Sequence, residues 1–272
     1  MLVLAAPAAA GVLDDPGDVA RTAVAFVAFC LAASGTYCIN DAVDAEADRR
    51  HVTKQHRPVA AGEVSVGSAL VLGGVLLVAA VAVSAAVGNW QLPLATVSYI
   101  AITTSYTLWL KRVAVFDIAA IAAGFVVRAL AGAAATEVHA SQWFLIVASF
   151  GSLFVVTGKR SSEFETSDDA IAQRSVLAKY PPQFLANVRA LSSGVTILAY
   201  TLFAFERATE TSSAVPWFQL SIIPFVLGIL RYGLRLDQGE GGAPEELVLG
   251  DRLLQAVGAI WAVLFLIGVG TD

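Results

Sequence analysis

The chain has 272 residues, of which 57% are hydrophobic and 14% are charged, and its mean hydropathy is +0.71. These values exclude a soluble domain of this size, which is less apolar and more charged, and they indicate an integral membrane protein. The net charge of −5 carries little information as a sum, and we expect no nucleic-acid partner.

Apolar runs long enough to cross a bilayer, roughly 17–25 residues each, recur along the whole chain. They lie near 19–39, 67–87, 90–110, 114–135, 142–158, 190–208, 214–234 and 251–270. A shorter run at 2–13 brings the expected number of helices to about nine; it lacks the charged leading region of a cleavable signal peptide. Because no linker interrupts these runs, we predict one integral membrane domain over residues 1–272.

Basic residues gather in alternate connections between these runs. Fourteen of the 17 Lys and Arg residues fall on one side, mostly in two long polar loops at 40–66 and 159–189. The positive-inside rule places those loops in the cytoplasm. Since the loops lie four helices apart in the count, we also predict a pseudo-repeat of two similar bundles that share one cavity.

The first polar loop opens with "NDAVDAEADRRHVTKQHRP", residues 40–58. If the preceding helix continues past Asn40, then Asp41, Asp44 and Asp48 share one face, because they are spaced three and four apart. Three like charges on one face repel, so a cation is expected there, and carboxylate oxygens suit Mg²⁺. The alternative is a solvated helix end in which the acidic residues only separate the basic ones.

The cations that follow exceed what metal ligation needs. Arg49, Lys54 and Arg57 add positive charge directly after the aspartates. An anionic substrate explains both signs, since Mg²⁺ and Lys or Arg side chains bind phosphate oxygens together. The region therefore predicts a phosphate-containing substrate.

Further along the chain, a charged residue falls inside an apolar run. Arg128 is costly in a membrane unless it is paired or faces a cavity. Its partner is either Asp117, about three turns away, or a substrate phosphate, and we favour the pair with Asp117. Tyr37 and Tyr106 could reach the cavity mouth, although tyrosines are also common at membrane interfaces.

The second polar loop reads "GKRSSEFETSDDAIAQRSVLAKYPPQFL" from residue 158. It opens with Lys159 and Arg160, and Glu163 follows. Asp168 and Asp169 are adjacent, which places them on different faces of a helix and makes a shared metal site poor there. This basic loop predicts that the substrate carries a second, separate anionic group.

These motifs resemble the UbiA superfamily of intramembrane prenyltransferases. "NDAVDAEADRRHVTKQHRPVAAGEVS" resembles its first motif, and "SYTLWLKRVAVFDIAAIAAGFVVRALAGAAA" at 105–135 resembles its fourth-to-fifth helix segment. The resemblance implies an all-α polytopic bundle of nine transmembrane helices around a central cavity. Ordinary members carry a second aspartate-rich motif where this chain has "GKRSSE". That pattern, with "LFAFER" downstream, is similar to the superfamily's decaprenyl-phosphate phosphoribosyltransferase branch.

The resemblance to this branch implies the substrates, cofactor and location. The donor is phosphoribosyl pyrophosphate, the acceptor is decaprenyl or another polyprenyl phosphate, and Mg²⁺ is held by the three aspartates. We expect an enzyme of cell-wall arabinan precursor synthesis in the bacterial inner membrane; a homo-oligomer stays open. Asn40 joins the aspartates as a candidate catalytic residue. Candidate substrate-binding residues are Tyr37, Arg49, Lys54, Arg57, Tyr106, Lys111, Asp117, Arg128, Lys159, Arg160 and Glu163.

Two other functions remain open from the sequence. The first is transfer of a prenyl group from a prenyl diphosphate to an aromatic acceptor, which uses the same fold. The second is a transporter that uses Arg128 and the polar loops as a pathway. Transporters usually place charge near the midplane, whereas here the charge lies mostly at one face.

Overall fold

The computed structural model describes residues 2–51, 54–165, 176–210 and 213–271, and every regular element among them is a helix. This confirms the predicted all-α class. In chain order the elements are η1 (Leu2–Leu4), α1 (Ala5–Ala9), α2 (Pro16–Arg49), η2 (Lys54–His56), α3 (Pro58–Ala61), α4 (Val66–Ala85), α5 (Gln91–Leu108), η3 (Leu110–Arg112), α6 (Phe116–Thr136), α7 (Gln142–Glu165), η4 (Leu177–Lys179), α9 (Pro182–Glu210), α10 (Trp217–Asp237), α11 (Pro244–Gly250) and α12 (Arg252–Val269).

Within the described residues, seven helices are long and apolar enough to cross a membrane: α2, α4, α6, α7, α9, α10 and α12. The predicted span at 90–110 corresponds to α5, which is less apolar because hydroxyl side chains recur along it. The predicted run at 2–13 forms only the short helices η1 and α1. The multi-pass bundle is thus confirmed, while the expected count of nine is not.

The two polar regions predicted as loops are partly helical. Helix α2 continues to Arg49, and α7 continues through Lys159 and Arg160 to Glu165. The apolar run marks where a helix can contact lipid, but the helix itself extends beyond the run. The first charged residues of each polar region therefore lie on helix ends, which fixes their relative spacing.

The chain divides by its internal contacts into two compact units. The first comprises Met1–Ala8 and Val12–His139, and the second comprises Ala9–Gly11 and Ala140–Asp272. Each unit is described by itself below. The single domain and the shared cavity stay predictions.

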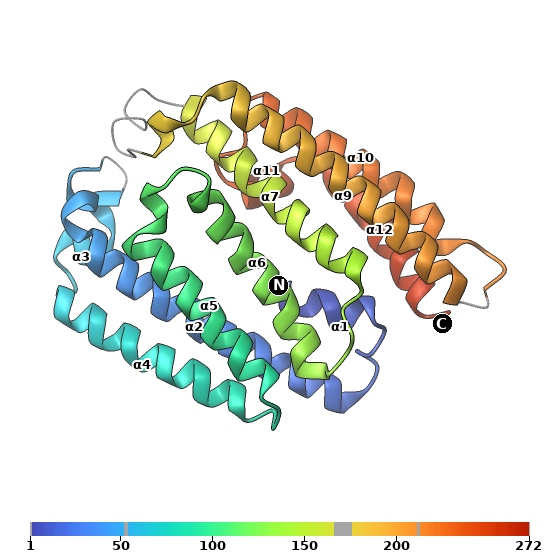
Figure 1. Cartoon of the computed structure of the whole chain (residues 1–272), viewed down its shortest axis with the longest axis horizontal. Coiled ribbons are helices and arrows are strands. Elements are labelled where there is room, and N and C mark those ends of the chain that lie inside the picture. The colour runs from blue at the N-terminus through green and yellow to red at the C-terminus, as the bar shows by residue number, and fades with distance from the viewer. Residues whose placement is uncertain (1, 52–53, 166–175, 211–212, 272) are drawn as a thin grey trace. The chain divides into compact units, whose positions relative to one another are not determined.

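In the first unit, α2 and α4 run side by side, as Figure 1 shows. Two glycines permit this close approach. A Cβ atom added at Gly35 would lie 3.0 Å from the carbonyl oxygen of Gly73, and one added at Gly73 would lie 3.0 Å from that of Gly35. Small residues at such contacts let the backbones of membrane helices pack closely.

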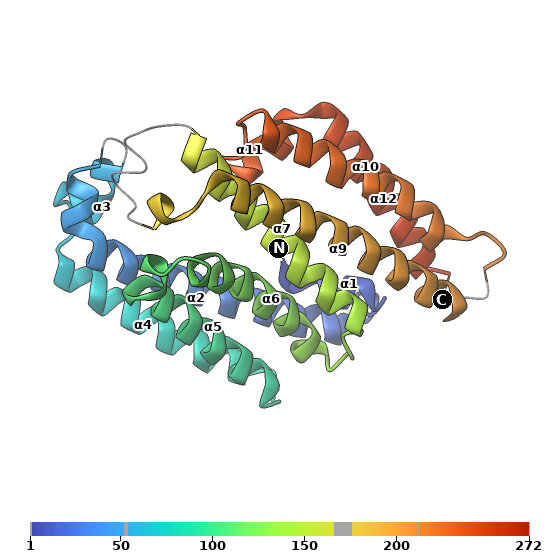
Figure 2. The same ribbon diagram turned by 45° about the horizontal axis from the view of Figure 1, so that its top comes forward.

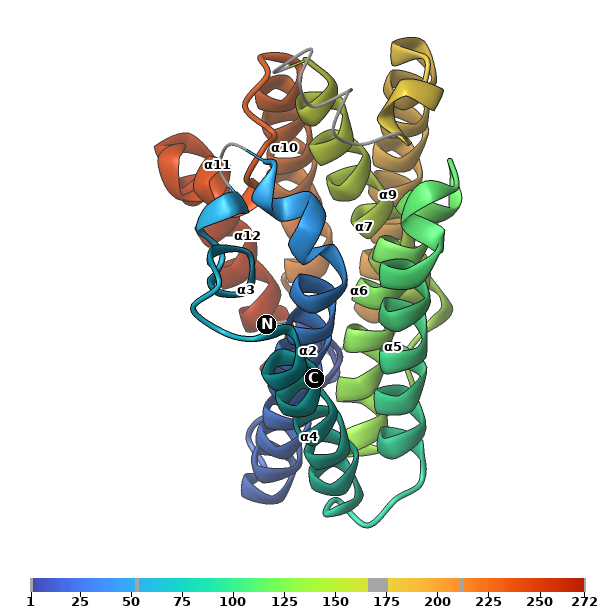
Figure 3. The same cartoon turned by 90° about the vertical axis from the view of Figure 1, so that its left-hand side faces the viewer.

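The core of the first unit joins α2 to α5. Phe29 of α2 packs against Tyr99 of α5 with ring centroids 5.2 Å apart. Leu92 of α5 belongs to the same buried cluster and is fully buried. Helix α6 lies alongside α5 (Figure 3). The first unit therefore holds α2, α5 and α6 in fixed register, and the polar end of α2 depends on that packing.

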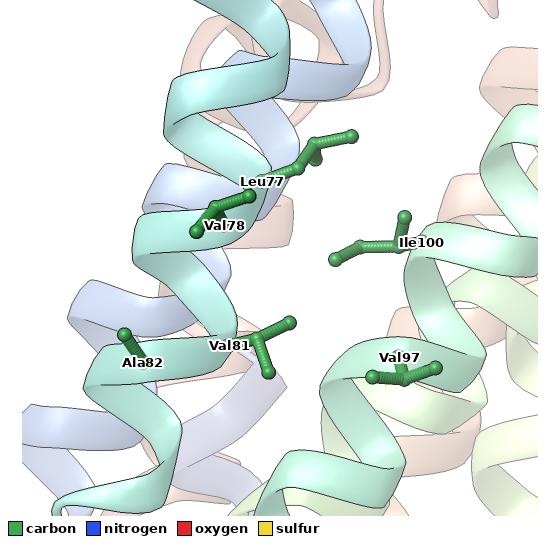
Figure 4. Close-up of a pocket in the computed structure, with 6 residues that line it drawn as sticks. All are labelled: Leu77, Val78, Val81, Ala82, Val97 and Ile100. Atoms are coloured by element: carbon green, nitrogen blue, oxygen red, sulfur yellow. The ribbon is translucent and has the colours of Figure 1, made fainter.

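A shallow groove of about 510 Å³ lies between α4 and α5. Figure 4 shows its six aliphatic lining residues, which are Leu77, Val78, Val81, Ala82, Val97 and Ile100. Since none of them is polar, this groove is separate from the charged residues at the end of α2.

The second unit has an aromatic core formed by α9, α10 and α12. Phe218 and Phe265 meet edge to face with centroids 5.7 Å apart, and the ring of Tyr200 stacks on Phe225. The Tyr200 hydroxyl is satisfied inside this core, because Trp261 Nε1 donates to it at 2.7 Å. Helices α10 and α12 run side by side in Figure 2.

Candidate active site

The three aspartates lie on one face of a continuous helix, as predicted. Asp41, Asp44 and Asp48 all fall within α2, and the side chain of Asp48 is only 7% exposed. Glu46 points away from this face: its side chain is 77% exposed and pairs with Arg50 at 3.0 Å. The sequence spacing therefore correctly separated the three inward aspartates from their acidic neighbour.

Arg57 bridges two of these aspartates. Its Nη1 atom donates to Asp41 Oδ1 at 2.9 Å and to Asp48 Oδ2 at 2.8 Å. Arg57 is the residue before Pro58, which begins α3, so the short helix fixes where the arginine returns toward α2. The two carboxylates are close enough to share one cationic group.

The third aspartate is paired with a residue 67 positions away. Lys111 Nζ donates to both oxygens of Asp44, at 2.6 and 2.7 Å. One turn of α2 earlier, Asn40 Oδ1 accepts a hydrogen bond from the Thr107 hydroxyl at 3.3 Å. The end of α5 and the following η3 thus complete the cluster that α2 begins.

The donor set of this cluster fits a hard divalent cation. Asp41, Asp44 and Asp48 supply carboxylate oxygens and Asn40 supplies an amide oxygen, which are the ligands that Mg²⁺ prefers. The three carboxylates outnumber the two cations that contact them, Arg57 and Lys111. Arg57 Nη1 already bridges two of the carboxylates, so a cation between them is compatible with the geometry. No group of three or more potential ligands is drawn together around one point in the described residues, and the metal site stays a prediction.

The other predicted residues of the first unit are divided. Arg49 Nε donates to the carbonyl oxygen of Ala60 at 3.2 Å, which ties the end of α2 to α3. Lys54 lies in η2, in the connection between α2 and α3, and is partly buried. Asp117 is completely buried in the first turn of α6, whereas Tyr37, one turn before Asp41 on α2, is 69% exposed. Arg49 is therefore bonded to the backbone of α3 and Asp117 is enclosed by protein, while the predicted roles of Tyr37 and Lys54 in substrate binding stay predictions.

The favoured pair of Arg128 with Asp117 is wrong. Arg128 Nη2 instead donates to the Tyr99 hydroxyl at 2.5 Å, and its guanidinium carbon lies 4.9 Å from the centre of the Tyr99 ring. The intervening turns of α6 separate Arg128 from Asp117, whereas the neighbouring helix α5 brings Tyr99 alongside. Tyr106, also on α5, is partly buried nearer the cluster.

The second polar region lies at the end of α7 in the second unit. Lys159 is exposed, whereas Arg160 is buried and donates to Glu163 Oε2 at 2.6 Å, one turn along the helix. The described end of α7 carries two basic residues, Lys159 and Arg160, and two acidic ones, Glu163 and Glu165. Asp168 and Asp169 lie outside the described residues, so the prediction about their geometry is not tested.

The connection between α10 and α11 packs on the segment of α7 that carries Lys159 and Arg160. The backbone N–H of Gly241 donates to Ser162 Oγ at 2.7 Å, and both groups are buried. A Cβ atom at Gly241 would lie 2.5 Å from Leu236 Cδ2 and 3.1 Å from the carbonyl oxygen of Gly158. The position thus requires glycine, and the loop packs directly on the helix turn that carries Lys159 and Arg160.

Sequence reasoning did not identify Tyr99, Thr107, Ser162 or Gly241. A signal for the first two was present, because hydroxyl side chains recur every four residues along α5 and the series ends at Lys111. No local pattern indicated Ser162 and Gly241, which lie 79 residues apart.

The comparisons with known proteins agree with the motifs. Residues 1–250 match the UbiA prenyltransferase family. The chain is 42% identical to the decaprenyl-phosphate phosphoribosyltransferase of Mycolicibacterium smegmatis, over 100% of this chain and 86% of that protein. It is 39% identical to the protein of the same description from Corynebacterium glutamicum, over 99% of this chain and 82% of that protein.

The solved structures support the fold. A UbiA homolog from Archaeoglobus fulgidus, bound to GPP and Mg²⁺, superposes with a TM-score of 0.74 at 16% sequence identity, covering 99% of this chain and 95% of that chain. The resemblance identified from the motifs is confirmed. The chain belongs to the UbiA prenyltransferase family.

Proposed function

We propose that this protein transfers the 5-phosphoribosyl group of phosphoribosyl pyrophosphate to decaprenyl phosphate or a similar polyprenyl phosphate. The bond between C1 of the ribose and the diphosphate oxygen breaks, an oxygen of the lipid phosphate bonds to C1, and diphosphate leaves. The function of the decaprenyl-phosphate phosphoribosyltransferases that are 39–42% identical along nearly the whole chain supports this assignment.

The observation that carries the proposal is the face of three aspartates at the end of α2, together with the adjacent basic residues Lys159 and Arg160 near the end of α7. The end of α2 has three carboxylates and suits a diphosphate that arrives with a divalent cation. The end of α7 has Lys159 and Arg160 and suits a phosphate directly. A donor with a diphosphate and a separate 5-phosphate needs both kinds of surface, whereas a prenyl diphosphate has one anionic group.

In this proposal Asp41, Asp44 and Asp48 hold Mg²⁺, with Asn40 beside them. When bound, the ion neutralises the diphosphate and stabilises its departure from C1. Arg57 and Lys111 exchange their carboxylate partners for phosphate oxygens of the donor. Lys159 contacts the 5-phosphate from its exposed position, and Arg160 orients Glu163 beside it.

The acceptor requires little activation. A phosphate monoester is already ionised at neutral pH, so the site needs no strong general base. The chain's role is to align the lipid phosphate with C1 and to exclude water, which would otherwise hydrolyse the donor. Attack from the face opposite the diphosphate inverts C1. We place the reaction at the cytoplasmic face of a bacterial inner membrane, in the synthesis of cell-wall arabinan precursors.

The test uses purified protein in detergent with labelled phosphoribosyl pyrophosphate, decaprenyl phosphate and Mg²⁺. We expect a labelled product that partitions into organic solvent, together with stoichiometric diphosphate. Transfer of a prenyl group from a prenyl diphosphate to an aromatic acid, with no sugar lipid formed, would refute the proposal. Uptake of substrate into liposomes without conversion would refute it in favour of transport.

A further inference from the structure

Arg128 is a cation inside a membrane helix with an unusual set of neighbours. It lies in α6, one of the helices apolar enough to span the bilayer. Its guanidinium carbon is 4.9 Å from the centre of the Tyr99 ring and 5.3 Å from that of Phe125, and Nη2 donates to the Tyr99 hydroxyl. The side chain is therefore held by aromatic groups and one phenol.

The support for Arg128 is itself rigid. Tyr99 is only 2% exposed and packs on Phe29 of α2. Gly124, one turn before Arg128, faces the same ring: a Cβ atom there would make an ordinary van der Waals contact with Tyr99 Cε2 at 3.7 Å. Three helices of the first unit thus fix the direction of the guanidinium before any ligand arrives.

No carboxylate neutralises this cation within the part of the chain that the structure describes. The Tyr99 hydroxyl is its single hydrogen-bond partner there, and the remaining guanidinium nitrogens are not enclosed by protein atoms. A charged arginine at membrane depth is costly and is normally paired with an anion. The Arg128 guanidinium therefore has N–H donors available for an anionic ligand, and its position is fixed by the protein.

A polar strip connects this position with the aspartate cluster. Tyr99, Thr103 and Thr107 follow each other at intervals of four, so they lie along one side of α5, and Lys111 follows in η3. Tyr99 is nine residues, or roughly 14 Å at 1.5 Å per residue, from the end of α5. An anionic group bound at Arg128 thus lies deeper in the membrane than the aspartate cluster, beside the polar side of α5.

We propose that Arg128 and Tyr99 form a phosphate-binding subsite at membrane depth, distinct from the aspartate cluster. The inference rests on the proposed function for the identity of its ligand. Two phosphate monoesters are then available, the head group of the polyprenyl phosphate and the 5-phosphate of the donor. The lipid phosphate is the expected occupant, because it alone arrives from the membrane and needs a cation along its route to the cluster.

The decisive experiment measures binding without turnover. Farnesyl phosphate is titrated into the detergent-solubilised protein in the absence of donor and Mg²⁺, and the dissociation constant is measured by calorimetry. Arg128→Gln should weaken binding about ten- to a hundred-fold, the range expected for loss of charge-assisted hydrogen bonds. Arg128→Lys should recover part, because a point charge replaces a planar fork.

Matched controls separate this effect from a general loss of structure. Arg21→Gln removes an equal charge from an exposed helix surface and should leave binding unchanged. Farnesol, which lacks the phosphate, should bind wild type and Arg128→Gln equally. If Arg128→Gln does not fold, Tyr99→Phe keeps the ring and removes the hydroxyl that fixes Arg128, and it should weaken farnesyl phosphate binding several-fold.

A second titration identifies the source of the phosphate. Phosphoribosyl pyrophosphate with Mg²⁺ is titrated into the same variants, and weakened binding of this ligand alone would assign the subsite to the donor. Unchanged affinity for both phosphates in Arg128→Gln, or in Tyr99→Phe where the first does not fold, overturns the subsite. A wild-type protein that binds farnesyl phosphate through Arg128 but forms no product would refute the proposed function and leave the subsite intact.

Discussion

The ends of α2 and α7 are both helical extensions into a polar region, but they carry different charged residues. Both helices continue past their apolar runs and carry the first charged residues of a polar region. At the end of α2, three aspartates contact Arg57 and Lys111, whereas the end of α7 carries Lys159 and Arg160 together with Glu163 and Glu165. From this difference we expect the two ends to bind anions differently: the aspartate face through an added cation, and the end of α7 through Lys159 directly.

The largest expected effect comes from the acidic end. Replacing Asp41 or Asp44 by Ala should lower turnover about a thousand-fold or more, because a bound metal ion supplies several kcal/mol of charge stabilisation and each 1.36 kcal/mol is about ten-fold in rate. Initial rates with labelled donor at several Mg²⁺ concentrations measure the loss. Gel filtration checks that the variants remain folded.

Glu46→Ala is the matched control for these variants. Glu46 lies on the same helix but pairs with Arg50 on the exposed face, so its removal should change turnover less than about two-fold, in line with the small value of surface ion pairs. If Asp44→Ala and Glu46→Ala retained equal activity, the distinct role of the aspartate face would be lost.

The basic end should show an effect on donor affinity. Lys159→Ala should raise the KM for phosphoribosyl pyrophosphate about ten- to a hundred-fold, the value of one charge-assisted contact to a phosphate, with little change in the KM for the lipid. Steady-state kinetics with each substrate varied in turn measure both constants. Arg252→Ala removes another exposed cation of the same unit and should leave both KM values unchanged.

Arg160 should differ from Lys159 in its effect on stability. Because it is buried and bonded to Glu163, Arg160→Ala should lower the melting temperature as well as raise the donor KM. Arg160→Lys should recover only part of the donor affinity, since lysine lacks the bidentate fork. A loss of stability with an unchanged donor KM would restrict Arg160 to a structural role.

A smaller effect concerns the loop that supports the basic segment. Gly241→Ala places a Cβ atom 2.5 Å from Leu236 Cδ2 and 2.7 Å from Ser162 Oγ, so it should destabilise the protein by about 1–3 kcal/mol, as overpacking does. Thermal unfolding in detergent measures the shift. Gly242→Ala meets no atom within 4 Å and is the neighbouring control. Equal shifts in the two variants would argue against a tight contact at Gly241.

The smallest expected effect is the pH dependence of a structural aspartate. The backbone N–H of Leu254 and the Arg231 guanidinium hold the pKa of Asp251 below its usual value, although burial acts in the opposite direction. A lowered folded-state pKa favours the charged form, so this stabilisation is present above about pH 4, the usual value for aspartate, and is lost as the pH falls through the folded value. Asp251→Asn should therefore melt lower at neutral pH and lose less stability on acidification.

Asp237→Asn is the comparison for that measurement. Asp237 is an exposed partner of Arg189, and surface ion pairs contribute little, so this variant should follow the wild-type pH profile. A wild-type profile for Asp251→Asn as well would contradict the assigned cause.

Features set by short spacing could be predicted from the sequence. The common face of Asp41, Asp44 and Asp48, and the outward direction of Glu46, follow from 3.6 residues per helical turn. The helix class and most of the membrane spans follow from the length of the apolar runs. These predictions needed no knowledge of how one helix packs on another.

Features that depend on helix packing could not be predicted in this way. The bond from Lys111 to Asp44 joins residues 67 positions apart, and the partner of Arg128 is on the neighbouring helix and not on its own. Apolar patterning shows which side of a helix is buried, but it does not specify the rotation and height at which two helices meet. Polar pairs between helices are set by that register, which the sequence spacing does not contain.

The bridge from Arg57 to Asp41 and Asp48, together with the pair of Lys111 and Asp44, has a consequence for the life of the protein in the cell. Like charges crowded on one helix face would strain the fold, but here the chain provides its own counter-ions. The protein can therefore be inserted and matured before it encounters any divalent ion. Under the proposed function, we therefore expect depletion of that ion to lower the rate of catalysis reversibly without loss of folded protein from the membrane.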